Sequence, residues 1–179
     1  MKLPPELVLA AFAASGGALK TADFLGERDG RGRAVLAAAA AALLFGLLMT
    51  ESAVSASIIL GLLLGVTAAR KVDRPNLVVG LILTFIVALL LGVQPPQPGL
   101  VAVVAVISVV DEWGHDARAG SAGAVALFFR HRCALKLAMS LLAVLGEIPI
   151  LYLMGFLAFD LAYDLVHRVI EKPEAGDAR

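Results

Sequence analysis

The chain has 179 residues, of which 60% are hydrophobic, and its mean hydropathy is +0.89. This apolar share is well above that of ordinary soluble domains, where it is roughly half, so a soluble globular fold is excluded. Fifteen basic residues balance fifteen acidic ones, and this zero net charge gives no reason to expect nucleic acid as a partner.

Seven apolar segments approach the length of about twenty residues that a helix needs to cross a bilayer. They are continuous and rich in alanine, leucine and glycine, without the alternation of a membrane β-barrel, so helices remain the way to satisfy the backbone in lipid. We therefore predict an all-α, polytopic transmembrane helical bundle with about seven spans. The predicted spans are 5–24, 34–50, 52–70, 76–94, 98–117, 133–147 and 149–170.

The connections between these segments are short and chemically distinct. Gly26–Arg33 is a charged loop with three glycines, Asp73–Pro75 contains a proline that favours a break, and Pro95–Gly99 is an uncharged turn. Met49–Ser52 allows only a tight helical hairpin. Glu147–Pro149 fits either a turn or a kink, and the bundle has six spans if 133–170 is one kinked helix.

Two stretches do not belong to the spans. Residues 120–129 are apolar but too short to cross a membrane, so they form either a segment lying on the membrane or an extension of the next helix. Residues 1–170 are predicted to form a single transmembrane domain. Residues 171–179 are predicted to be a disordered cytoplasmic tail, because they are polar and contain proline and glycine.

The basic residues orient the predicted bundle. With seven spans, every lysine and arginine other than Lys2 falls on one side of the membrane or close to it. Cytoplasmic loops carry an excess of these residues, so that side is predicted to be cytoplasmic. We expect a multi-pass protein of the cell membrane with the N-terminus outside and the C-terminus in the cytoplasm.

Acidic residues collect on the same side, at the cytoplasmic ends of the first, third, fifth and seventh spans. Several have helical spacing that puts them on one face, such as Asp111 with His115 four residues later. Asp160 lies ten residues into an apolar segment, where a carboxylate is costly and usually faces a cavity or a partner. The sequence therefore predicts a polar cup that faces the cytoplasm.

Three interpretations of this cup compete. One is a membrane enzyme, a transferase or hydrolase that acts on a lipid-linked or polyprenyl phosphate. The second is a small cation or proton transporter or channel, with Asp160, Asp23 and Lys20 along its path. The third is a non-catalytic scaffold whose charges merely sit at the interface. The outer half contributes as charges only Glu6, Glu51 and Glu147, which favours the enzyme over a path open alternately to both sides. Glu147 counts against this, because with Pro149 beside it the last two spans could form a broken helix that reaches the cup.

The enzyme hypothesis assigns a role to each cup residue. Carboxylates from several helices suit Mg²⁺ or Mn²⁺, which prefer oxygen ligands and bridge to phosphates. The predicted metal ligands are Asp23, Asp73, Asp111, Asp116, Asp160 and Asp164. The predicted catalytic groups are Asp111, Asp160 and His115, and the predicted binders of the substrate phosphate are Lys20, Lys71 and Arg118.

The sequence carries no motif that would fix the reaction. It has no Gly-x4-Gly-Lys-Ser/Thr phosphate loop, no His-Glu-x2-His zinc helix and no Gly-x-Ser-x-Gly nucleophile turn. The expected partners are the lipid bilayer and a lipid-phosphate substrate, with no nucleic acid. A homo-oligomer is left open, as are the substrate and the choice between enzyme and transporter.

Overall fold

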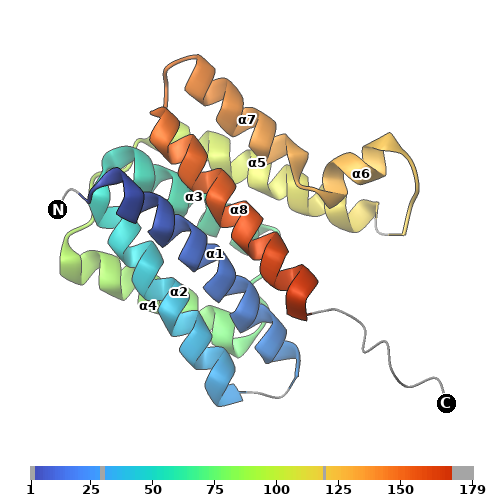
Figure 1. The fold of residues 1–179 in the computed structure, drawn as a ribbon, viewed down its shortest axis with the longest axis horizontal. Coiled ribbons are helices and arrows are strands. Elements are labelled where there is room, and N and C mark those ends of the chain that lie inside the picture. The colour runs from blue at the N-terminus through green and yellow to red at the C-terminus, as the bar shows by residue number, and fades with distance from the viewer. Residues whose placement is uncertain (1–2, 29–30, 119, 171–179) are drawn as a thin grey trace.

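The computed structural model describes residues 3–28, 31–118 and 120–170, and all regular structure within these ranges is helical (Figure 1). No strand occurs in them, which confirms the all-helical prediction. The eight helices of the described ranges are α1 (Pro5–Glu27), α2 (Arg31–Glu51), α3 (Ala53–Ala68), α4 (Pro75–Leu91), α5 (Pro98–Ala117), α6 (Ala124–Arg130), α7 (Cys133–Val144) and α8 (Ile150–Ile170). The predicted tail, 171–179, lies outside the described residues.

The helices begin where the sequence punctuates the apolar runs. Pro5, Pro75 and Pro98 stand at the first turns of α1, α4 and α5, where a missing N–H costs nothing because it has no partner within the helix. Ser52 is the only residue between α2 and α3, and its hydroxyl accepts a hydrogen bond from the backbone N–H of Ser55 at 3.1 Å. The predicted tight hairpin at this point is confirmed.

The surface and the helix lengths indicate a membrane protein. Among the described residues, α1, α2 and α8 are long and apolar enough to cross a membrane, with mean hydropathies of 1.2, 2.0 and 1.4 over their best windows. The helices α3, α4 and α7 are apolar but shorter. Large aliphatic side chains point outward along the bundle, among them Leu36, Ile82, Leu90 and Val106. A soluble protein rarely exposes so much contiguous apolar surface.

The helices form one bundle whose two ends differ (Figure 1). The helix α1 packs against α8 and α2, α2 packs against α4, and α3 and α7 pack against α5. Helices α1, α3, α5 and α8 finish at one end, where α2, α4 and α7 begin. We call this the charged end, because the acids and bases of the helix ends gather there. The described part of the N-terminus lies at the opposite end.

A close approach between α1 and α8 holds the middle of the bundle together. Gly16 on α1 leaves no room for a side chain, because a Cβ there would lie 2.2 Å from the carbonyl oxygen of Phe159 on α8. Its neighbour Gly17 has ordinary space, with Val166 as its nearest contact at 3.5 Å. The contact at Gly16 sets Asp160, the next residue after Phe159, beside α1 at the edge of the charged end.

Residues 133–170 form two helices, α7 and α8, that are joined by a turn. After α7, Gly146 adopts a left-handed φ of 78°, which glycine accepts without strain. The backbone N–H of Glu147 then donates to the carbonyl of Leu142 at 2.9 Å, and Pro149 stands just before α8. The alternative of one kinked helix over 133–170 is therefore not what the chain forms.

We predict that Gly16→Ala destabilises the protein and that Gly17→Ala does not. The added methyl at Gly16 must push α1 and α8 apart, and overpacking of this kind costs about 1–3 kcal/mol. At Gly17 alanine fits and gains helix propensity of about 1 kcal/mol. Unfolding in detergent, followed by far-ultraviolet circular dichroism during titration with sodium dodecyl sulfate, gives both free energies. Equal stability of the two variants would contradict the close packing.

Candidate functional site

A cavity of about 500 Å³ opens among the helices and reaches the charged end. Its deeper wall is apolar and comes mainly from α2, α3, α4 and α8, with residues such as Ala42, Leu63, Leu81 and Phe156. Towards the charged end the lining becomes ionic. The charged and titratable residues that line it are Asp23, Glu27, Lys71, Asp73, Arg74, Asp111, Glu112, His115, Asp116, Arg132, Asp160 and Tyr163.

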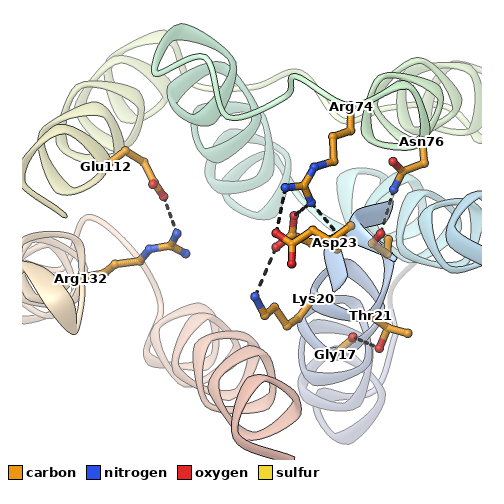
Figure 2. A network of polar contacts seen from close by, with 10 residues as sticks. Gly17, Lys20, Thr21, Asp23, Arg74, Asn76, Glu112 and Arg132 are labelled. Atoms are coloured by element: carbon orange, nitrogen blue, oxygen red, sulfur yellow. Dashed lines mark hydrogen bonds and ion pairs between the residues drawn. The ribbon is translucent and has the colours of Figure 1, made fainter. Parts of the chain in front are cut away.

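On one side of the cavity, α1 and the start of α4 are tied together by Arg74 (Figure 2). Its Nη1 donates to a carboxylate oxygen of Asp23 and to the backbone carbonyl of the same residue, both at 2.9 Å. Its Nη2 donates to Glu27 at 2.8 Å, and this hydrogen bond raises the pKa of the Arg74 guanidinium above its ordinary value. Lys20 adds a contact of 3.3 Å to Asp23. The donors of Arg74 are thus directed at α1.

On the opposite side, Glu112 on α5 is the centre of a second cluster (Figure 2). Its Oε1 pairs with Nη2 of Arg132 at 2.8 Å, and its Oε2 lies 3.9 Å from the ammonium of Lys71. Lys71 also contacts Asp116 at 2.6 Å. Glu112 is only 4% exposed, and its Oε2 has no hydrogen-bond partner among the described residues. A buried carboxylate oxygen in this state is unusual and marks the cluster as a candidate site.

The sequence analysis missed Glu112 and Arg132 as site residues. It used Arg132 only as an indicator of the cytoplasmic side. One signal was available, because Glu112 and Asp116 are four residues apart and share a face of α5. That face needs basic partners from other segments, and Lys71 and Arg132 supply them.

The helical structure is interrupted between α6 and α7, and Asp111 on α5 stabilises this helix break. Arg132 has a left-handed φ of 49°. Directly after it, the carboxylate of Asp111 accepts the backbone N–H of Ala134 at 3.1 Å and that of Leu135 at 2.7 Å. These donors belong to the first turn of α7 and have no partner within the helix. Asp111 therefore caps α7 from a neighbouring helix, and a negative charge there also suits the helix dipole.

Lys136 completes the same break from the other side. Its ammonium donates to the backbone carbonyl of His131 at 2.5 Å and pairs with the carboxylate of Asp160 on α8 at 2.7 Å. The partner that Asp160 needs is thus a lysine of another helix. The break is held by α5 through Asp111 and by α8 through Asp160, which fixes Arg132 between them.

The predicted metal ligands do not fit a metal ion as they stand. Five of the six line the cavity, and Asp164 lines an adjoining recess. Within 3–28, 31–118 and 120–170, however, no group of three or more histidines, cysteines or acids is arranged to hold a metal. The physical reason is that bases and backbone amides separate the acids: Asp23 faces Arg74, Asp111 caps α7 and Asp160 faces Lys136.

The remaining predicted catalytic and substrate-binding residues lie at different places relative to the cavity and the recess. Lys71 lines the cavity, and Lys20, which is 8% exposed, lines the adjoining recess. Arg118 lines neither, because it ends α5 as an exposed cap. His115 lines both spaces, and its Nδ1 is buried with no hydrogen-bond partner in the part of the chain that the structure describes.

Comparison of the chain with protein-family models, with curated proteins and with solved structures found no match.

We predict that Asp111→Ala lowers the free energy of unfolding by about 1–3 kcal/mol, because it leaves two N–H donors of α7, one buried and one partly buried, without their acceptor. The matched control is Asp116→Ala on the same helix, which removes only a half-exposed pair and should cost at most about 1 kcal/mol. Unfolding in detergent measures both. If the control is destabilised as strongly as Asp111→Ala, then Asp111 does not act as the cap.

Proposed function

We propose that this protein is a multi-pass membrane protein that binds a lipid-linked phosphate in the central cavity and acts on its phosphate group. The observation that carries the proposal is the combination, in one space, of an apolar deeper wall with ionic groups at one end only. An amphiphile with a hydrocarbon chain and a charged head matches that distribution. The volume of about 500 Å³ lies within the range typical of ligand cavities.

The apolar wall supports a hydrocarbon chain as the buried part of the ligand. Small residues of α2, such as Ala38 and Ala42, leave the space open, and Leu63 and Phe156 add apolar surface from α3 and α8. Burial of hydrocarbon against such a wall gains about 25 cal/mol per Å² of apolar area. Thr84, a polar residue in the deeper part, donates a hydrogen bond to the carbonyl of Gly80 in its own helix at 2.9 Å.

The basic groups of the second cluster support a phosphate as the head. A guanidinium carries five N–H donors in a fork that matches phosphate oxygens. Arg132 directs one of its nitrogens at Glu112 and lies at the cavity wall, where Lys71 provides a second positive charge. By contrast, both terminal nitrogens of Arg74 are engaged with Asp23 and Glu27, whereas Arg132 pairs with Glu112 through Nη2 and Lys71 pairs with Asp116. We therefore assign the phosphate to the side of Arg132 and Lys71.

The same groups suit chemistry at phosphorus, as a transferase or a hydrolase. Fixed cations stabilise the negative charge that develops on phosphoryl oxygens during transfer. His115, whose Nδ1 lacks a hydrogen-bond partner, stands at the cavity wall as the candidate to accept a proton from the attacking hydroxyl or water. This version of the enzyme hypothesis uses the residues of the chain and requires no metal ligand set.

The proposed membrane arrangement has seven spans, α1 to α5 together with α7 and α8, and α6 lies at the cytoplasmic surface. The charged end faces the cytoplasm, in line with its excess of lysine and arginine over the opposite end. With 12 residues, α7 is about 18 Å long and spans only part of the hydrocarbon layer. The break before it then lies below the surface, where Asp111 and Lys136 satisfy the backbone as the membrane requires.

We predict that the purified protein binds geranylgeranyl phosphate more tightly than geranylgeraniol, and that Arg132→Gln removes this difference. The expected loss is about tenfold or more for the phosphate, because a hydrogen bond to a charged group is worth about 1.5–3 kcal/mol. Affinity for the alcohol should stay the same. Titration in detergent, followed by native mass spectrometry, gives the four values. Equal binding of both lipids to the unaltered protein would contradict a phosphate site.

The chain offers a matched pair of substitutions for the apolar wall. Leu63→Trp fills the cavity and should weaken binding of both lipids, whereas Leu64→Trp on the same helix points away, at 46% exposure, and should leave both unchanged. The same titration measures this pair. If Leu63→Trp binds the lipids as well as Leu64→Trp does, the hydrocarbon chain lies elsewhere.

The proposed orientation can be tested by labelling at two glycines, Gly32 and Gly99, where an added side chain meets nothing within 4 Å. In a Cys133→Ser background, a membrane-impermeant maleimide added to intact cells should label Gly99→Cys and not Gly32→Cys. Permeabilised cells provide the control, in which both should react. Labelling of Gly32→Cys from outside would reverse the proposed orientation.

A further inference from the structure

A second, smaller recess of about 190 Å³ lies at the charged end, beside the central cavity. It is lined from α1 by Lys20, from the break between α6 and α7 by Arg130, His131 and Arg132, and from α8 by His167. Three of these side chains, Arg130, His131 and His167, are exposed, so the recess is open to water. The proposed function does not use this space.

The recess and the cavity differ in the sign of their charge. In the cavity lining the acids outnumber the bases. In the recess the acids are Asp160 and Asp164, against the three bases Lys20, Arg130 and Arg132, and three histidines add imidazole groups. Asp160 is paired with Lys136 at 2.7 Å, Lys20 with Asp23 at 3.3 Å and Arg132 with Glu112 at 2.8 Å. The lining of the recess is therefore the more basic of the two, which favours a multivalent anion there.

The backbone break gives this positive charge a defined shape. Arg130, His131 and Arg132 follow one another where the chain leaves α6, and Arg132 turns back through its left-handed conformation. The cap from Asp111 and the hydrogen bond from Lys136 to His131 hold the break in place. The side-chain N–H donors of Arg130, His131 and Arg132, which the helix break holds in place, suit a phosphate, because a phosphate accepts several hydrogen bonds at once.

The recess and the cavity share a wall made of His115, Arg132, Asp160 and Tyr163. The Tyr163 ring lies at the centre of this wall, with the Arg132 guanidinium 5.4 Å and the Lys20 ammonium 5.5 Å from its centroid. An anion in the recess would therefore lie one side chain away from the head of a lipid in the cavity.

From this geometry we propose that the recess binds a soluble phosphate or diphosphate anion, next to the phosphate of the lipid and on the water side of it. This inference rests on the proposed function and deepens it, because it gives the reaction a water-soluble reactant or product of phosphate chemistry. Arg132 is the residue that both anions would contact.

The test is calorimetric titration of the full-length protein in detergent with inorganic diphosphate, in the presence of a chelator that removes divalent metals. We expect saturable binding that Arg130→Gln and, separately, His131→Gln weaken by about tenfold. The control is Arg33→Gln, an exposed arginine at the start of α2 outside both spaces, which removes the same charge and should leave the affinity unchanged. Thermal unfolding of each variant verifies the fold.

Three results would overturn the recess as a separate site. They are the absence of saturable diphosphate binding, an equal loss of affinity in Arg33→Gln, and competitive displacement of diphosphate by geranylgeranyl phosphate, which would make the recess the place of the lipid head. The Leu63→Trp variant separates this proposal from the proposed function. If that variant keeps diphosphate binding and loses lipid binding, both sites stand. If the unaltered protein binds diphosphate but no lipid, the recess stands and the proposed function fails.

Discussion

The charged end of the bundle depends on one interaction, the cap that Asp111 of α5 places on the first turn of α7. Its carboxylate is 2% exposed, so its burial is costly unless its oxygens are satisfied. The two backbone N–H groups of α7 satisfy them, and the aspartate in turn satisfies those donors. Because the cap fixes where α7 begins, it also fixes Arg132, the residue just before it. The position of Arg132 beside Glu112 and between two cavities follows from that constraint.

Several other acids of this end are paired with bases from other segments. Arg74 connects α4 to α1, Lys71 approaches α5, and Lys136 connects α7 to α8. These pairs are partly buried, so we expect the loss of one partner to leave the other charge poorly compensated. Within the described part of the chain, the second carboxylate oxygen of Glu112 and the Nδ1 of His115 have no hydrogen-bond partner. Both lie on the wall to which we assign the phosphate.

Much of the fold could be predicted from the sequence, and less of the site could. The helices were predictable because prolines and charged loops interrupt long apolar runs, as at Pro75 and Pro98. The gathering of charges at one end followed from their positions at helix ends. The partners of these charges could not be predicted from the sequence. Asp111 binds backbone amides 23 and 24 residues away, and this contact depends on a helix break that no side-chain pattern encodes. The apolar stretch before Arg130 was ambiguous for the same reason, and it became the separate helix α6.

In this protein, a helix break that Asp111 and Lys136 hold in place positions Arg132 at the polar end of an apolar cavity. The most direct test is a structure of the protein with a geranylgeranyl phosphate analogue that carries a bromine at the far end of its chain. The account predicts the phosphate within hydrogen-bonding distance of Arg132 and the bromine among α2, α3 and α8, beside Leu63 and Phe156. A bromine on the outer surface of the bundle, or a phosphate far from Arg132, would contradict it.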